Sequence, residues 1–254
     1  MPNGLFSMDP PRHDRLRPIL DTLFEKAISG LDTAAASIAK PLLDAAKSSR
    51  RLELVSNYAM PLPSNVLKIV LGISDDDWRG VEHWVSGVVA GHDYTAPAAS
   101  QAMGGTCALA LGAYFQALTR PGCPMRAAQG RMIDLMLLKA EVEGMLHEEV
   151  QMTLVNLAVA GYLSTVFLLA TGTLNLLRNP EQLALLRGKP ELMGNAIEEM
   201  LRFDAPAQLA DRYVAADTEI AGVKLKAVDQ ITAVLGTAKR APDASAHPDG
   251  VDRS

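Results

Sequence analysis

Residues 150–177 contain no charged side chain, and this run constrains the fold more than any other feature of the sequence. As one α-helix it would be roughly 42 Å long, which is enough to cross a lipid bilayer. However, polar residues such as Asn156 and Asn175 interrupt the run, acidic residues crowd its start, and no aromatic belt or basic flank marks both ends. The run therefore predicts a long helix through the middle of a soluble protein, with a membrane span as the less favoured alternative.

Most of the remaining sequence is also typical of helices. Asp9 followed by Pro10 predicts the start of a helix over residues 11–24, which the internal Pro18 should bend or divide. The stretch 91–106 is rich in Gly, Ala and Ser and predicts a loop. Further helices are predicted at residues 33–48, 61–72, 75–91, 107–120, 180–188 and 190–203.

The spacing of the apolar residues changes after residue 203. Two short runs, 218–225 and 230–236, are typical of strands, so a small sheet should follow the helices. Residues 242–254 are polar and include two prolines, which predicts a disordered tail. No linker or internal repeat divides the chain, and we therefore expect residues 1–254 to form a single domain.

Composition narrows the possible functions. The chain has 254 residues, 48% of them hydrophobic, which predicts a folded core, and a net charge of -5 without a basic block argues against nucleic acid as a partner. Cys107 and Cys123 form no disulfide or metal-ligand pattern, and the five histidines show no paired spacing, so we predict no metal site built from these residues. No secretory or transit signal is readable at the N-terminus, so the cytoplasm is the expected location.

Two charged pairs lie at helical spacing. Glu199 and Arg202 are three residues apart, and His13 and Arg17 are four apart near a helix start, so each pair shares one face of its helix. Taken alone, both pairs are typical of solvated helix surfaces. The small residues around Ala160 in the long helix would let another backbone or a flat ligand come close, and tight helix packing explains them equally well.

The order of these motifs along the chain resembles that of the bacterial cytochrome P-450 enzymes, which are haem-thiolate monooxygenases. The stretch "FSMDPPRHDRLRPIL" resembles the helix in which the family's HxxxR pair contacts the haem propionates. The stretch "AIEEMLRFDAPAQLADRY" resembles the family's ExxR helix, with Glu199 and Arg202 as a buried structural pair. Other similar stretches are residues 52–73, 157–187 and 217–249, so the resemblance covers nearly the whole chain.

This resemblance implies a mainly α fold, namely a partial cytochrome P-450 fold. In that fold a helical bundle surrounds a long central helix, and a small β-sheet lies near the C-terminus. The resemblance also implies haem as the cofactor of the full-length family. The residues that it assigns to cofactor binding are His13, Arg17, Ala160, Gly161 and Arg212.

The oxygen-activation motif of the central helix departs from the family pattern. That pattern has an acid followed by two threonines, and the acid and the first threonine relay protons to bound oxygen. In this chain Leu163 stands where the acid belongs, followed by Ser164 and Thr165. Leu163 cannot take part in a proton relay, so the resemblance implies a degenerate catalytic motif at Ser164 and Thr165.

Other departures lie towards both ends. In the family, the cysteine that ligates the haem iron lies in a loop beyond the small sheet, and the chain stops at Ser254 before a matching loop. The strands that precede the propionate helix are missing too, so we expect a chain truncated at both ends, in which neither cysteine is the iron ligand. Val228 occupies a turn position that favours glycine, and residues 239–241 read Lys-Arg-Ala in place of Asn-Arg-Asp.

Two functions remain open at this point. The first is a monooxygenase that hydroxylates a small organic substrate with O2 and takes electrons from a ferredoxin-type donor. The second is a non-catalytic relative, either a helper that binds a protein partner or the remnant of a decayed gene. For this chain we expect no oxygen activation, and weak haem binding or none, because the axial thiolate and the relay acid are both missing.

Overall fold

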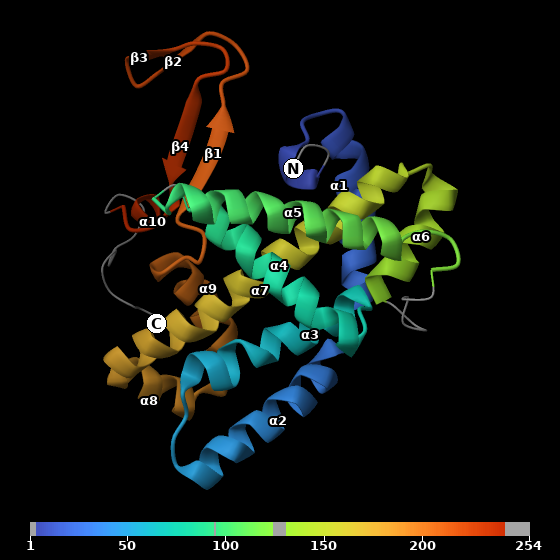
Figure 1. Ribbon diagram of the computed structural model, residues 1–254. Coiled ribbons are helices and arrows are strands. Elements are labelled where there is room, and N and C mark those ends of the chain that lie inside the picture. Colours follow the sequence, from blue (N-terminus) through green and yellow to red (C-terminus); the bar gives the residue numbers. More distant parts are fainter. Residues whose placement is uncertain (1–3, 94, 124–130, 242–254) are drawn as a thin grey trace. The chain divides into compact units, whose positions relative to one another are not determined.

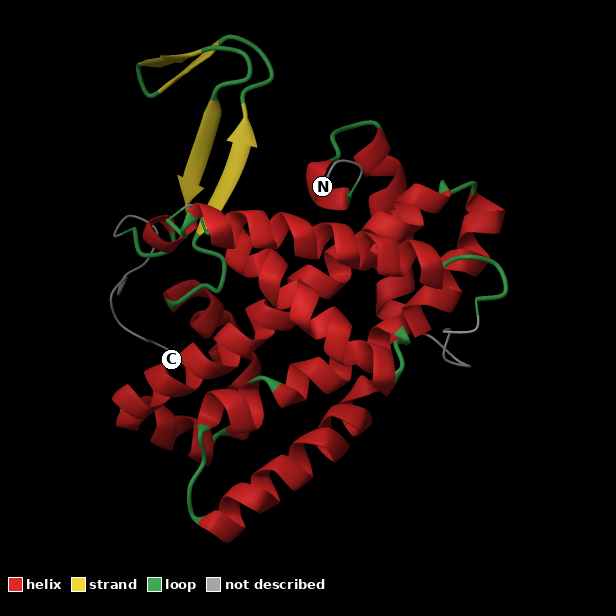
Figure 2. Ribbon diagram, viewed as in Figure 1, coloured by secondary structure: helices red, strands yellow, loops and turns green. Residues whose placement is uncertain are grey.

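The computed structural model describes residues 4–93, 95–123 and 131–241, and it is mainly helical with a small sheet, as predicted (Figure 1, Figure 2). Contacts within the chain divide it into two compact units, Met1–Val166 and Phe167–Ser254. The expectation of one domain over residues 1–254 stays a prediction. The predicted disordered tail, residues 242–254, lies outside the described residues.

The first unit is built from helices. Its core forms where apolar residues recur at helical spacing, such as Leu16, Leu20 and Leu23 on its first long helix, which are buried on one face. In chain order the helices are η1 (Leu5–Ser7), α1 (Arg12–Ile28), α2 (Leu31–Ser49), η2 (Val55–Ala59), α3 (Pro61–Leu71), α4 (Asp75–Gly91), α5 (Ala98–Leu118), α6 (Arg131–Glu143) and the first part of α7 (His147–Arg178).

The first long helix, α1, corrects two predictions. It runs without interruption through Pro18, so Pro18 does not divide the helix, and the alternative of a bend at Pro18 stays a prediction. Leu16 and Leu20 are buried on either side of Pro18, and their burial favours one continuous helix although proline cannot donate a backbone hydrogen bond. Asp9 is not the N-cap, because Pro11 occupies that position and no side chain caps the helix.

The start of α5 corrects a third prediction, because residues 98–106 are helical rather than a loop. The helix packs against α4 (Figure 1). A Cβ atom placed on Gly104 would lie 2.6 Å from the Cα atom of Gly91 and 3.1 Å from the carbonyl oxygen of Gly87. The small residues that suggested a loop are therefore the ones that let two helix backbones approach each other, a tertiary effect that composition does not reveal.

The predicted long central helix is α7, and it is continuous from His147 to Arg178. Among the described residues it is the one helix long and apolar enough to cross a membrane. Its first half lies in the core of the first unit, where Val150, Leu154 and Tyr162 are buried. That burial is what a core helix of a helical bundle requires.

The second unit combines short helices with four strands. Its first two helices begin where the sequence predicts them, with Pro180 and Pro190 each in a first turn, where the missing N–H costs nothing. Its last helix was not predicted, because residues 235 and 236 were assigned to the second strand-like run, whereas they begin a short helix. After the last part of α7 its elements are α8 (Pro180–Gly188), η3 (Pro190–Leu192), α9 (Met193–Phe203), β1 (Leu209–Tyr213), β2 (Thr218–Ile220), β3 (Val223–Leu225), β4 (Gln230–Val234) and α10 (Leu235–Ala238).

The strands form two antiparallel pairs, which are drawn in yellow in Figure 2. β2 pairs with β3, so the predicted strand-like run 218–225 is a hairpin, with Ala221 and Gly222 at positive φ in its turn. β1 pairs with β4, with Leu209 opposite Val234. β1 was not predicted, because "LADRY" contains two charged residues and gains its partner only from a strand that follows much later.

Candidate functional site

Two of the predicted cofactor-binding residues, Arg17 and Ala160, line the same cavity in the first unit. The cavity lies between α1 and α7 and has a volume of about 210 Å³. Most of its wall is apolar, and the charged residues are Arg17 and Asp21 on α1. The complete lining consists of Leu5, Phe6, Arg17, Leu20, Asp21, Phe24, Met132, Thr153, Asn156, Leu157 and Ala160. An apolar wall with a cation beside it suits an apolar ligand that carries an acid group.

The guanidinium of Arg17 is held by Asp21, one helical turn further along α1. Its Nε atom donates to the two carboxylate oxygens of Asp21 at 2.8 and 2.9 Å, and this hydrogen bond and the Asp21 charge raise the pKa of Arg17. No described residue accepts a hydrogen bond from the two Nη groups of Arg17. Sequence reasoning missed Asp21, although its spacing of four residues from Arg17 was the available signal.

His13 and Gly161 do not line this cavity. The His13 Nδ1 atom lies 3.4 Å from a carboxylate oxygen of Asp14, its neighbour on α1. A Cβ atom on Gly161 would lie 3.2 Å from the Cδ1 atom of Leu67, so this glycine allows α7 to approach α3. The structure thus brings Arg17 and Ala160 together and places the other two residues elsewhere in the first unit.

The predicted oxygen-activation residues lie on the next turn of α7. The Ser164 hydroxyl donates to the backbone carbonyl of Ala160, and the Thr165 hydroxyl donates to that of Gly161 at 3.0 Å. Both side chains are exposed, whereas Leu163 is partly buried. Each hydroxyl is therefore engaged with the helix backbone, and a role in proton transfer requires it to turn away from that carbonyl.

Tyr162 lies beside these residues on α7, and it was not assigned a role from the sequence. Tyr162 is completely buried, and its hydroxyl donates to the Glu82 carboxylate of α4 at 2.6 Å. Burial and this hydrogen bond raise the pKa of Tyr162, so the phenol stays protonated as a donor. Because the two residues are far apart in sequence, no local spacing could have indicated the contact, which joins α7 to α4.

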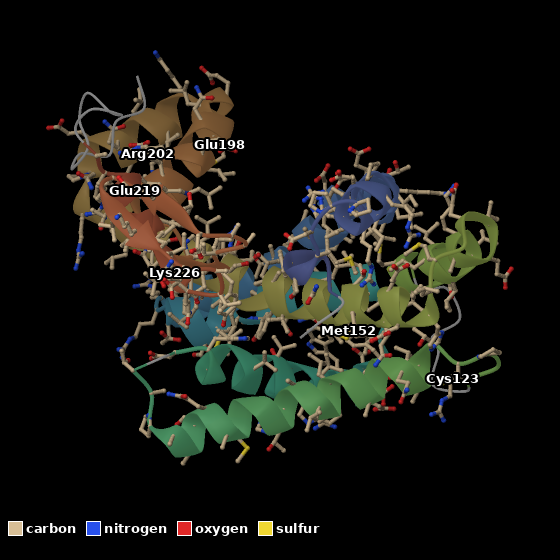
Figure 3. All side chains as sticks on the ribbon, turned by 90° about the horizontal axis from the view of Figure 1, so that it is seen from above. Cys123, Met152, Glu198, Arg202, Glu219 and Lys226 are labelled. Carbon is tan, nitrogen blue, oxygen red and sulfur yellow. The ribbon has the colours of Figure 1, made fainter. Side chains whose placement is uncertain are left out.

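In the second unit, Glu199 and Arg202 form a two-point ion pair on α9, and Arg202 is labelled in Figure 3. Arg202 Nε donates to one carboxylate oxygen at 2.7 Å and Nη2 donates to the other at 2.8 Å. The side chains are 24% and 13% exposed for Arg202 and Glu199, and the Glu199 hydrogen bond raises the pKa of Arg202. The pair is therefore more sheltered than an ordinary surface pair.

Cations also gather at the C-terminal end of α9. Arg202 donates to the Lys239 carbonyl, Lys239 Nζ donates to the Leu201 carbonyl, and the Nε and Nη2 atoms of Arg240 donate to the Phe203 carbonyl. The Arg240 guanidinium also lies 4.2 Å from the centre of the Phe203 ring. Lys239 and Arg240 belong to the Lys-Arg-Ala segment that departs from the family pattern, and they satisfy carbonyls at the end of α9.

Arg212, the remaining predicted cation, lies on β1 in the second unit. Its Nη1 atom donates to the backbone carbonyl of Asp211 at 2.7 Å, and its side chain is exposed. No carboxylate in the described part of the chain lies within ion-pair distance of Arg212. Its charge is therefore not neutralised by a described side chain.

Neither cysteine lies in an arrangement typical of a metal ligand. Cys107 is buried where α5 meets Gly87 of α4, and Cys123 is partly buried shortly after α5. Over residues 4–93, 95–123 and 131–241, no group of three or more His, Cys, Asp or Glu side chains is placed to hold a metal ion.

Comparison with known proteins identifies homologues of the chain. No family model matches the chain. It is 31% identical to the biotin biosynthesis cytochrome P-450 of Bacillus subtilis, over 95% of this chain and 61% of that protein. It is also 31% identical to the 6-deoxyerythronolide B hydroxylase of Saccharopolyspora erythraea, over 92% of this chain and 57% of that protein. The homologues of this chain are cytochromes P-450. Haem is the cofactor of this family's full-length members, and the chain spans about three fifths of the length of these curated relatives.

Solved structures of cytochromes P-450 have the same fold. The crystal structure of the BioI P-450 in complex with an acyl carrier protein ligated to hexadec-9Z-enoic acid matches with a TM-score of 0.87 and 29% identity, over 98% of this chain and 64% of that chain. A P-450 of Bacillus megaterium in complex with testosterone also matches with a TM-score of 0.87, at 26% identity over 98% and 66% of the two chains. The predicted fold class, a partial P-450 fold around a long central helix, is confirmed.

Proposed function

We propose that this chain is the haem-binding part of a cytochrome P-450 monooxygenase, in which Arg17 neutralises an acid group of the cofactor. The observation that supports this most strongly is the shared cavity of Arg17 and Ala160, in a chain related to cytochromes P-450 over nearly all of its length. The proposed reaction is the hydroxylation of a small organic substrate with O2.

The cavity suits haem in its chemistry more than in its size. Arginine offers a planar set of donors that matches a carboxylate, and the apolar wall formed by residues such as Leu20 and Phe24 suits a flat apolar ring. The volume of about 210 Å³ lies below the roughly 300 to 1,000 Å³ of typical ligand pockets. Binding therefore requires side chains of the wall to move. It also requires Arg17 to give up its hydrogen bonds to Asp21 and to bind the acid group of the ligand instead.

When bound, haem supplies the oxygen chemistry of this family. The residues of this chain would supply binding and proton handling, and they are poorly suited to the second task. Leu163 holds no proton, and the hydroxyls of Ser164 and Thr165 donate to the helix backbone. Cys107 is buried where α5 meets α4 and does not line the cavity. We therefore propose that this chain by itself activates O2 weakly or not at all.

The proposed partners follow from the same family assignment. A monooxygenase of this type needs electrons, and we propose a ferredoxin-type protein as the donor and a small organic molecule as the substrate. The burial of the first half of α7 in the first unit supports a cytoplasmic location, because it uses the apolar run as a core helix.

Titration with hemin tests the proposal directly. Absorbance in the Soret region should saturate at about one hemin per chain, and Arg17→Gln should weaken binding about tenfold, because it removes a charged hydrogen bond to a carboxylate. Arg79→Gln is the matched control, since Arg79 is an exposed arginine on α4 outside the cavity. The proposal fails if the chain takes up no hemin, or if both variants bind it as the wild type does.

A further inference from the structure

A buried carboxylate ties the start of α1 to the start of α7. Glu149, in the first turn of α7, is only 1% exposed. Arg15 Nη2 donates to its two oxygens at 2.6 and 2.8 Å, Arg12 Nη2 lies 3.4 Å from one of them, and the backbone N–H of Leu146 donates to the other at 3.0 Å. Glu149, Arg12 and Arg15 together form a clamp between the two helices.

The electrostatics keep Glu149 charged. Burial raises the pKa of its carboxyl group, but the hydrogen bonds from Arg15 and Leu146 and the positive charge of Arg15 outweigh burial, and the pKa is lowered overall. A buried carboxylate without these partners would be strongly disfavoured. Glu149 therefore requires α1 to lie where Arg15 can reach it.

Because Arg15 and Arg17 lie on the same helix, the position that Glu149 requires of Arg15 also determines the position of Arg17. Arg15 and Arg17 are two residues apart, so they point to nearly opposite sides of α1. Arg15 reaches the start of α7, while Arg17 lines the cavity that also contains Ala160, three turns further along α7. Hydrogen bonds of this type tolerate displacements of only a few tenths of an ångström. The clamp thus favours one rotation and one axial position of α1.

We infer that Glu149 is a positioning residue, which holds α1 so that Arg17 faces the ligand cavity. This inference rests on the proposed haem-binding function for its ligand, and on the observed contacts for its geometry. Glu149 does not line the cavity, and the contacts of its carboxylate with Arg12 and Arg15 connect it to α1, the helix that carries Arg17.

A double-mutant cycle separates positioning from general stability. Glu149→Gln should weaken hemin binding about tenfold in the wild-type background and less than about twofold in the Arg17→Gln background, because residues that act through one another give non-additive effects. Glu143→Gln is the control, as it makes the same change at an exposed ion pair with Lys139. If Glu149→Gln does not fold, Arg15→Gln replaces it, since that variant leaves Arg12 and the Leu146 N–H on the carboxylate.

Amide hydrogen exchange tests the clamp without haem. Glu149→Gln should speed exchange of the α1 amides about tenfold relative to those of α4, and Glu143→Gln should leave both unchanged. The inference is overturned if the effects on hemin binding add in the cycle, or if exchange in α1 does not change. If the wild-type chain takes up no hemin, the proposed function fails, and the exchange result alone decides whether Glu149 positions α1.

Discussion

Replacing Gly104 with alanine tests whether α4 and α5 pack backbone against backbone. The added methyl group would lie 2.6 Å from the Cα atom of Gly91, 3.2 Å from its nitrogen and 3.1 Å from the carbonyl oxygen of Gly87. All three are backbone atoms, so no side-chain rotation can relieve the overlap. The helices must move apart by roughly 1 Å to restore ordinary carbon contacts of 3.5–4.0 Å.

The neighbouring Gly105 provides a matched control, because a Cβ atom there meets nothing within 4 Å and the residue is exposed on the same helix. Each substitution gains about 0.8–1.0 kcal/mol of helix propensity. Gly104→Ala also overpacks the contact between α4 and α5, and overpacking typically costs about 1–3 kcal/mol. The difference between the two variants therefore isolates the packing cost, and we expect Gly104→Ala to be less stable than Gly105→Ala by about 2 kcal/mol.

Urea unfolding followed by tryptophan fluorescence measures this difference, since Trp78 and Trp84 both lie on α4. With a slope of about 2 kcal/mol per M, the midpoints of the two variants should differ by about 1 M. If the two midpoints agree to within about 0.2 M, the close approach of the helices at Gly104 is refuted.

Strain, capping and titration each provide a further test. Val228 has a φ of 67°, a conformation that costs residues other than glycine about 1–2 kcal/mol. In urea unfolding, Val228→Gly should therefore raise the free energy of unfolding by about 1 kcal/mol, whereas the control Val223→Gly should lower it. A lower free energy of unfolding in both variants would contradict backbone strain at Val228. Arg240→Ala should lower this free energy by about 1 kcal/mol, because it frees the Phe203 carbonyl, and an unchanged thermal midpoint would contradict that role. The pKa of Glu149 is lowered by folding, so the stability advantage over Glu149→Gln should be complete above pH of about 4.5 and shrink as the pH falls through the lowered value. An advantage that does not change with pH would refute this assignment.

The sequence alone predicted the features of this protein that depend on the spacing of neighbouring residues. Residues three or four apart on a helix are neighbours whatever the rest of the fold does, so the Glu199–Arg202 pair and the shared helix of His13 and Arg17 followed from the sequence. The uncharged run 150–177 required one long helix, and α7 has that form. The order of the motifs also indicated a resemblance to cytochromes P-450, and the homologues of the chain are cytochromes P-450.

Contacts between distant residues were decided by the tertiary structure. Arg15 meets Glu149, and Tyr162 meets Glu82, across separations at which sequence spacing carries no information. The same is true of residues 98–106, whose glycines suggested a loop until burial against α4 made the helix favourable. Glycine weakens a helix by about 1 kcal/mol as a local preference, and only the packing of a second backbone against it can reverse that preference.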